Sequence, residues 1–224
     1  MKRILLLLFA LLAIAQGTMA QQNRNMTLRL SFNPTFNWLY VGGNDAKDTK
    51  TGMGFDYGIN ADFFIDNNDR YAITTGIIIT NQNSKVSYEP NHDYNIGNIN
   101  YTANTPLSVD YHLKYVEVPV AFRLRSKQFN RNTFWGQFGL FTAWNFDARA
   151  STSDGELHKN DIDKDVRLFN MGLNIGLGLE YDLGENNALS LGFVYKNGFI
   201  DCLKNNLGDN TTTKTLALEV SFVF

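Results

Sequence analysis

Hydrophobic and polar residues alternate with a period of two along most of the chain. The clearest example is residues 169–183, FNMGLNIGLGLEYDL, in which every odd-numbered residue is apolar and every even-numbered residue is Asn, Gly, Glu or Asp. This period is typical of a β-strand that has one face against hydrocarbon. The pattern alone leaves open whether that hydrocarbon is a protein core or a lipid bilayer.

Eight segments of this kind follow one another along the chain. They cover residues 27–40, 53–65, 71–80, 115–125, 134–149, 169–183, 189–196 and 215–224. Short links rich in turn-forming residues, at 66–69, 126–132 and 184–187, alternate with longer polar links at roughly 42–52, 84–110, 150–166 and 198–213. Short turns at one end and long loops at the other predict an up-and-down antiparallel barrel.

Two kinds of barrel fit eight strands. A lipocalin-like soluble barrel has its apolar side chains inside, whereas an outer-membrane barrel has them outside. Here the polar face combines glycines with charged residues. Glycine weakens a solvent-exposed strand face, but inside a narrow barrel it leaves room for long charged neighbours. The sequence therefore favours the membrane form: an all-β, eight-stranded antiparallel up-and-down transmembrane β-barrel.

The predicted lumen contains a network of charged side chains. Its members are Arg29, Asp56, Asp62, Glu117, Arg123, Arg125, Asp147, Arg149, Glu180, Asp182, Lys196 and Glu219. Charged groups in such an interior must pair with one another, and an eight-stranded barrel is only just wide enough for its side chains. We interpret the network as a plug that closes the barrel and expect no large diffusion channel. A conducting or proton-passing pore is the alternative.

Aromatic residues occur where two interfacial girdles would require them. Those near the loop ends of their strands are Trp38, Tyr40, Trp144 and Tyr195, and those near the turn ends are Tyr71 and Tyr181. The last strand closes on Phe224, which resembles the signal recognised by the outer-membrane assembly machinery. We therefore expect Phe224 to act as an assembly signal.

The first residues have the features of a secretory signal peptide. Lys2 and Arg3 precede the apolar segment 4–15, and Thr18-Met19-Ala20 forms a small-residue cleavage site. We predict a signal peptide over residues 1–20 and a barrel domain over residues 21–224. Its removal takes two of the 20 basic residues and leaves all 22 acidic ones, a net charge near −4. This charge gives no reason to expect nucleic acid as a partner.

Two motifs resemble a known family. Residues 115–127, YVEVPVAFRLRSK, are similar to the Tyr-Leu-Glu-Ile-Pro-type strand of the PorT-like outer-membrane barrels of Bacteroidetes, and residues 172–180 resemble their later Gly-rich strand. The founding members are accessory components of the type IX protein secretion system, so the resemblance implies an accessory role in secretion as one alternative. Only Glu117 and Pro119 carry over, and they do so as structural residues.

Catalytic chemistry has one weak candidate. Ser108, Asp110 and His112 lie close together before the fourth predicted strand, at a height where a lipid-modifying enzyme would need them. No nucleophile motif surrounds Ser108, so a polar loop entering a strand is the simpler interpretation. His92, His112 and His158 lack metal-ligand spacing. We predict that the protein is not an enzyme and has no catalytic, cofactor-binding or metal-binding residues.

The sequence thus predicts a small outer-membrane barrel that acts as a scaffold or through its loops. Both termini are expected in the periplasm and the long loops outside the cell. The loop at 84–110 is rich in Asn and carries Tyr88, Tyr94 and Tyr101, a composition suited to adaptable contacts. The expected partners are outer-membrane lipids and lipopolysaccharide, the assembly machinery, and other envelope or secretion proteins.

Overall fold

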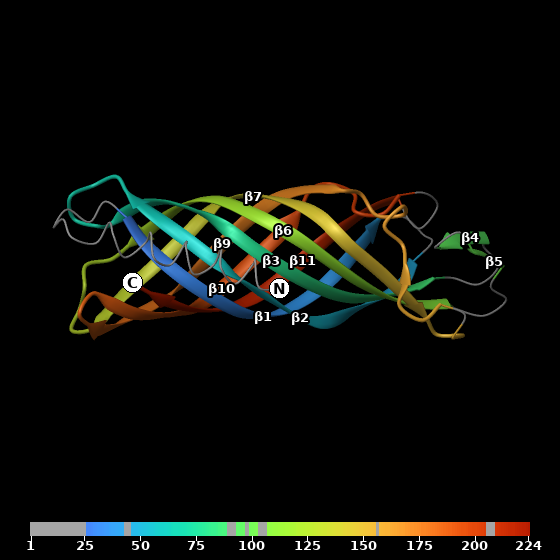
Figure 1. Ribbon diagram of the computed structural model, residues 1–224, viewed down its shortest axis with the longest axis horizontal. Helices are drawn as coiled ribbons and strands as arrows, with labels where there is room; N and C mark the ends of the chain where they lie inside the picture. Colours follow the sequence, from blue (N-terminus) through green and yellow to red (C-terminus); the bar gives the residue numbers. More distant parts are fainter. Residues whose placement is uncertain are drawn as a thin grey trace, which may run out of the picture.

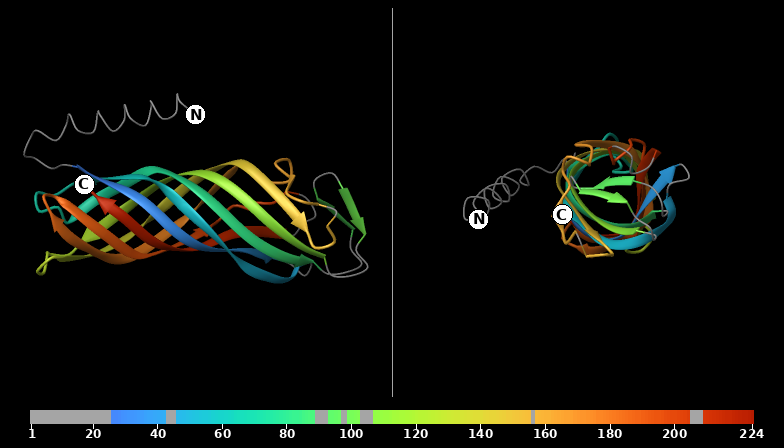
Figure 2. Two further views of the ribbon diagram at one scale, coloured as in Figure 1. Left: turned by 60° about the horizontal axis from the view of Figure 1, so that its bottom comes forward. Right: turned by 90° about the vertical axis from the view of Figure 1, so that its right-hand side faces the viewer.

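The long strands close into a single barrel. The computed structural model describes residues 26–42, 46–88, 93–96, 99–102, 107–155, 157–204 and 209–224. Eight long antiparallel strands are joined in chain order, and the first pairs with the last, so the ring has no open edge (Figures 1 and 2). They are β1 (Met26–Gly42), β2 (Ala46–Phe64), β3 (Tyr71–Tyr88), β6 (Leu107–Arg125), β7 (Asn132–Thr152), β9 (Phe169–Gly184), β10 (Asn187–Gly198) and β11 (Asp209–Val223). The predicted fold class is confirmed.

The two ends of the barrel differ. Tight turns connect the strands at one end, where the C-terminus also lies (Figure 1). Glu185 and Asn186 form one of these turns with positive φ angles of 53° and 71°, the conformation that tight hairpins require. At the other end lie the short hairpin β4 (Asp93–Ile96) and β5 (Ile99–Thr102), and the two-residue strand β8 (Asn160–Asp161) beside β7. We call these the turn end and the loop end.

The strands continue further toward the loop end than the sequence interpretation allowed. β3 runs to Tyr88 and β6 begins at Leu107, so both flanks of the expected link at 84–110 are strand. β6 and β7 have 19 and 21 residues, about twice the ~9–11 that cross a bilayer. The prediction of long links was wrong in extent, and β6 and β7 each have a second half beyond a membrane-sized segment.

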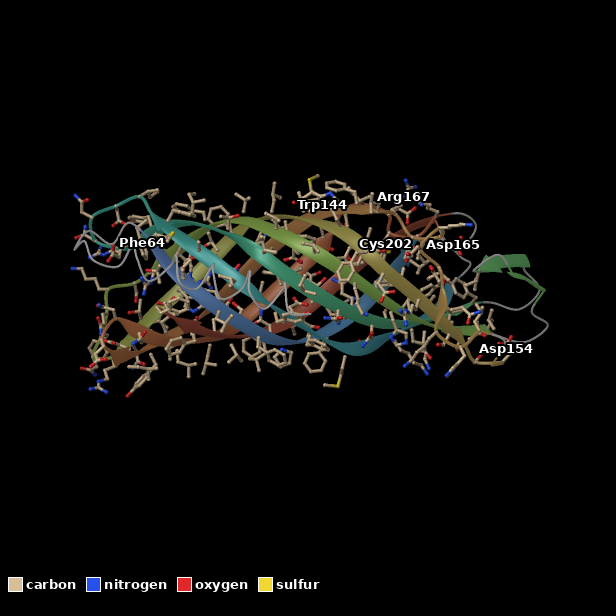
Figure 3. The ribbon with its side chains drawn as sticks, in the orientation of Figure 1. Phe64, Trp144, Asp154, Asp165, Arg167 and Cys202 are labelled. Atoms are coloured by element: carbon tan, nitrogen blue, oxygen red, sulfur yellow. The ribbon has the colours of Figure 1, made fainter. Side chains whose placement is uncertain are left out.

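Apolar side chains form a belt around the outside of the barrel. Phe32, Met53, Ile77 and Leu177 are each more than half exposed. The aromatic residues expected at the girdles also point outward. At the loop end Trp38 lies 6.4 Å from Tyr195, centroid to centroid, and Trp144 lies on the outer surface (Figure 3). This exterior is the reverse of a soluble protein, in which such side chains are buried.

The predicted signal peptide, residues 1–20, lies outside the described residues. In the part of the chain that the structure describes, no helix is long and apolar enough to cross a membrane.

Candidate functional site

Three layers of side chains fill the lumen. At the turn end lies an arginine cluster, defined by Arg29, Asp62, Arg123, Arg125, Glu180 and Glu219. Next comes a lysine trio, defined by Asp56, Glu117 and Lys196. The loop-end half holds an apolar plug, described below. The candidate site is this filled interior together with the outer surface around it.

Two arginines organise the arginine cluster, and the first is Arg29. One terminal nitrogen of its guanidinium donates to Asp62 Oδ1 at 3.0 Å and the other donates to Glu219 at 2.7 Å, and its Nε lies within ion-pair distance of Asp62 Oδ2, at 2.9 Å. The Thr74 hydroxyl donates a further hydrogen bond of 2.6 Å to Asp62. Hydrogen bonds between a guanidinium and carboxylates are shorter and stronger than those between neutral groups.

The second organising residue is Arg123, which is fully buried. Its guanidinium donates to Glu180 at 3.0 Å and to the Gln137 side chain at 2.9 Å, and it stacks over the Trp135 ring at 3.9 Å. Arg125 pairs with the other oxygen of Glu180 at the turn-end mouth. Three arginines therefore meet three carboxylates, and the cluster is neutral.

The lysine trio has more acid than base. Lys196 Nζ lies 2.9 Å from Asp56 Oδ2 and 2.8 Å from Glu117 Oε1, and all three side chains are buried. Among the described residues, Asp56 Oδ1 has no hydrogen-bond partner. A cavity of about 40 Å³ separates the trio from the arginine cluster, with Lys196 and Glu117 on one side and Arg29 and Glu219 on the other. This cavity has room for about one to three water molecules.

The apolar plug fills the loop-end half of the barrel. Its buried residues come from the strands and from the loops above them: Leu39, Val86, Tyr88, Ile96, Leu107, Val109, Tyr111, Leu113, Tyr115, Phe141, Ala143, Ala148, Ala150, Leu157, Ile162, Val166, Cys202 and Leu203. The Tyr88 and Tyr111 hydroxyls share a hydrogen bond of 2.8 Å inside it. Cys202 lies at this end near Asp165 and Arg167 (Figure 3). Burial raises the pKa of the Cys202 thiol well above its usual range.

The plug arises from an inversion of the alternation along single strands. In β6, the even-numbered residues 116–124 are apolar and point outward, while Glu117 and Arg123 point inward. From Tyr115 back to Leu107, the odd-numbered residues are apolar and point inward, and the even-numbered ones are polar and point outward. The barrel is therefore polar inside and apolar outside toward the turn end, and the reverse toward the loop end. In the sequence, the apolar residues of β6 move from even-numbered to odd-numbered positions between Val116 and Tyr115, and the sequence interpretation missed this signal.

Two residues of the predicted lumen network lie outside the barrel. The register between β6 and β7 shifts next to Lys114, and Phe146 is an extra residue without a partner. Beyond this bulge the faces of β7 exchange, so Asp147 and Arg149 point outward and the alanines beside them point inward. Asp147 pairs with Lys114 at 2.7 Å and with Arg149 at 3.0 Å on the outer surface. Their assignment to the lumen was wrong.

A third residue, Asp182, lies at the edge of the network. It borders an open depression of about 560 Å³ at the turn-end mouth. Its carboxylate accepts hydrogen bonds from the Gln128 side chain at 2.9 Å and from the Gly184 backbone at 2.8 Å. These bonds hold the pKa of Asp182 below its usual range. Of the remaining predicted network residues, all but Arg125 are buried in the arginine cluster or the lysine trio.

Three glycines of the lumen face, Gly172, Gly178 and Gly192, make room for aromatic rings rather than for charged side chains. A Cβ atom on Gly178 or Gly192 would lie 2.5 Å or 2.4 Å from the Trp135 ring, and one on Gly172 would lie 2.6 Å from the Phe141 ring. Trp135 and Phe141 are buried on the inward face of β7. In the structure, they are the residues that these glycines accommodate.

The three residues considered for catalysis face outward on β6 but do not form a relay. Each pairs across to β3 instead: the Ser108 and Ser87 hydroxyls lie 2.9 Å apart, and Asp110 lies 3.1 Å from Lys85. His112 Nδ1 lies 2.8 Å from Asn83 Oδ1. Within the described ranges, no hydrogen bond joins the three side chains to one another, and no cluster of potential metal ligands is found.

Other predicted features are placed as follows. Phe224 closes the barrel by exchanging backbone hydrogen bonds of 2.9 and 3.0 Å with Leu28. Of the tyrosines expected in a loop, Tyr88 is instead buried in the plug, and the side chains of Tyr94 and Tyr101 lie outside the described residues, as does His92.

Comparison with known proteins gives one family. Residues 19–204 match the protein family described as outer membrane protein beta-barrel domain. A comparison with curated protein sequences gave no match.

Several solved structures resemble the fold at low identity. Neisserial surface protein A (NspA), from Neisseria, is 14% identical with a TM-score of 0.46, and the similarity covers 88% of this chain and 96% of that one. OprG, an outer membrane protein from Pseudomonas aeruginosa, is 13% identical with a TM-score of 0.46, covering 89% and 94%. Ail, the attachment invasion locus protein of Yersinia pestis, is 13% identical with a TM-score of 0.42, covering 88% and 98%.

Proposed function

Because the chain belongs to the family of outer membrane protein beta-barrel domains, we propose that it is a closed barrel that acts as a scaffold or through its extracellular loops. In this proposal residues 1–20 are a signal peptide, the turn end and both termini are periplasmic, and the loop end is extracellular. The observation that carries the proposal is the filling of the described lumen by two ion clusters and an apolar plug. In a barrel filled in this way, the groups that can meet a partner lie on the outer surface and the loops.

Non-catalytic action is supported by the separate pairing of Ser108, Asp110 and His112, each with a different residue of β3. A lipid-modifying enzyme would need a nucleophile and a base within hydrogen-bond reach of each other. Deletion of the gene should therefore leave the mass of lipid A unchanged. A change in that mass would contradict this part of the proposal.

A finer alternative is a PorT-like accessory role in type IX protein secretion. It rests on the motif at 115–127, in which Tyr115 contributes to the apolar plug and Glu117 to the lysine trio. Both contacts are structural, so they are compatible with this role without favouring it. Loss of cargo export on deletion would support the secretion role, whereas envelope fragility with normal export would support a scaffold.

Cysteine labelling tests the location and the orientation together. His158→Cys places a thiol on the exposed loop end, and Asn67→Cys places one in an exposed turn at the other end. The native Cys202 is buried, so it gives little background. Intact cells treated with a membrane-impermeant maleimide should label only His158→Cys, and permeabilised cells should label both variants.

The reverse labelling pattern would contradict the orientation. Absence of label on both variants in intact cells, with label on both after permeabilisation, would contradict exposure at the cell surface.

A further inference from the structure

A cluster of basic side chains lies on the outer surface, beside the boundary of the apolar belt. Four neighbouring strands, β2, β3, β6 and β7, contribute to it. We call it the basic patch and define it by Lys50, Lys85, His112, Lys114 and Arg149. Lys85 and Lys114 have side chains about 40% exposed, and Arg149 is 51% exposed. None of these residues belongs to the lumen clusters.

The position of the patch follows from the inversion of the strands. On β3 and β6 the last outward apolar residues are Ile79 and Val116, which pair with each other. The next outward pair toward the loop end is Asn81 with Lys114, followed by Asn83 with His112 and Lys85 with Asp110. The patch thus begins one outward pair beyond the apolar belt. In a bilayer this is the level of the lipid headgroups.

The patch has an excess of positive charge that the protein does not neutralise. Lys50, Lys85, Lys114 and Arg149 face three carboxylates, Asp110, Asp147 and, opposite Arg149 on β8, Asp161, which leaves an excess of one positive charge when His112 is neutral. Lys50 has no ion-pair partner in the described part of the chain.

The strand register adds a second observation. Lys50 is directly opposite Lys85 on the outer face, and His112 is directly opposite Arg149. Like charges in direct cross-strand opposition, as in the Lys50–Lys85 pair, destabilise a sheet. Protonation of His112 would add a second such pair, and an external anion would relieve both.

A groove lies beside the Lys50–Lys85 pair. It has a volume of about 290 Å³, and Lys50, Lys85 and His112 line it together with Asp110. A β-bulge in β2 shapes it, since the register with β3 shifts between Thr51 and Phe55. Gly52 lies at this bulge, where a Cβ atom would come within 2.1 Å of the Asn83 carbonyl oxygen. The groove therefore depends on a glycine at this position.

The donors of the groove suit a phosphate group. Asn83 Nδ2 donates to the Met53 carbonyl at 2.6 Å, so its Oδ1 is the acceptor for His112 Nδ1. His112 Nδ1 therefore carries the proton of the neutral ring, and Nε2 becomes a donor to a phosphate when the ring is protonated, in a groove that Lys50 and Lys85 also line. Ammonium and imidazole groups are typical ligands of phosphate oxygens.

We propose that the basic patch binds the phosphorylated headgroup of an outer-leaflet lipid, of the lipid A class. The proposal rests on the proposed function, because it requires the loop end to face outward. The lipid's acyl chains lie against the outward apolar residues of β3 and β6, and its phosphate lies in the groove. A soluble polyanion would have no need for a site at the edge of the apolar belt.

The test compares two triple variants of the full barrel in zwitterionic detergent micelles. The patch variant is Lys50→Gln/Lys114→Gln/Arg149→Gln, and the matched control, Arg70→Gln/Lys127→Gln/Arg131→Gln, removes three charges at the turn end. Native mass spectrometry measures the binding of diphosphorylated lipid A to each. Basic residues near an anionic surface contribute enough that the patch variant should lose about 10-fold or more in affinity, and the control less than about twofold.

Three results would overturn the proposal: equal affinities for the two variants, equal binding of dephosphorylated lipid A by the native protein, or heparin binding that is lost in the patch variant while lipid A binding is kept. If the triple variant does not fold, Lys50→Gln and Arg149→Gln singly should each lose up to about fivefold. This binding is measured without reference to orientation. Failure of the cysteine labelling with patch-dependent binding retained would therefore indicate a fault in the proposed function alone.

Discussion

Lys196 illustrates how much depends on single residues in a closed lumen. It is the only base within ion-pair distance of Asp56 and Glu117 among the described residues, and all three side chains are buried. Lys196→Met leaves two buried carboxylates without a cation, and breaking a buried ion pair in this way costs about 3–5 kcal/mol. We expect that loss in urea unfolding of the protein in detergent micelles, followed by tryptophan fluorescence.

A companion variant separates charge from packing. Lys196→Met/Asp56→Asn/Glu117→Gln removes every charge of the trio with little change in volume. It should regain most of the lost stability, because replacing a whole buried ion cluster by neutral groups is often close to neutral. Equal stability losses in the single and triple variants would show that the two unpaired carboxylates are not the cause of the loss.

His112 offers a test of the basic patch by titration. Partial burial and the nearby Lys159 and Lys114 lower its pKa below the ordinary 6.5, against the opposing effect of Asp110. Imidazole NMR shifts should therefore show protonation only below that pH. Lys114→Gln should raise the pKa of His112 and Asp110→Asn should lower it further.

A bound phosphate favours the imidazolium form of His112, so lipid A should also raise this pKa and should bind more tightly as the pH falls. A pKa above 6.5 in the free protein would contradict the described surroundings.

The cost of a charged residue on the outer face of a strand should depend on its depth in the membrane. In β9, Leu177 points outward and is 65% exposed, whereas Leu183 lies near the turn end. Leu177→Arg should cost about 2–4 kcal/mol in lipid bilayers and Leu183→Arg about 0–1 kcal/mol, since the penalty for arginine on the lipid face falls toward the interface. Reversible unfolding in phospholipid vesicles measures both. Equal penalties would argue against a membrane boundary between these two positions.

The loop-end half of β6 should behave as a soluble core. Leu113 is buried in the apolar plug, and its neighbour Lys114 is on the outer surface. Leu113→Ala should cost about 2–5 kcal/mol because it leaves a cavity, and Lys114→Ala should cost less than about 1 kcal/mol because it removes one exposed ion pair. The same unfolding assay distinguishes them. Similar values for the two would contradict the inversion of faces.

The sequence predicts the strands well but misses the bulge in β7. Alternation was enough for the eight strands, because a period of two is a local property. The lengths of the links then gave the barrel topology, and the glycines on the polar face gave the inward direction of Arg29, Glu117 and Arg123. The bulge at Phe146 could not be read in this way. One extra residue exchanges the faces of everything beyond it, which is why Arg149 was assigned to the lumen when it belongs to the basic patch.

At the scale of the whole molecule, the three layers of the lumen lie one after another along the path that a solute would take, and they differ in chemistry. The arginine cluster and lysine trio are ionic, and the apolar plug is dry. A channel needs a continuous polar path, and the 40 Å³ cavity between the ion clusters is a pocket between two such barriers. Scaffold or surface action follows more directly from this arrangement than transport does.

The absence of conduction can therefore be tested layer by layer. The native protein in planar bilayers should show no stable single-channel steps. Arg123→Gly/Trp135→Gly removes the centre of the arginine cluster, and Tyr88→Gly/Tyr111→Gly thins the plug, but each variant should remain silent because the other layer still closes the lumen. Only the combined variant should leak, because an eight-stranded barrel stays closed as long as side chains fill it. Heat-modifiable migration on gels provides the control for folding and insertion. Stable steps from the native protein, or from either double variant, would mean that the layers do not act as independent barriers and that the lumen opens to solutes.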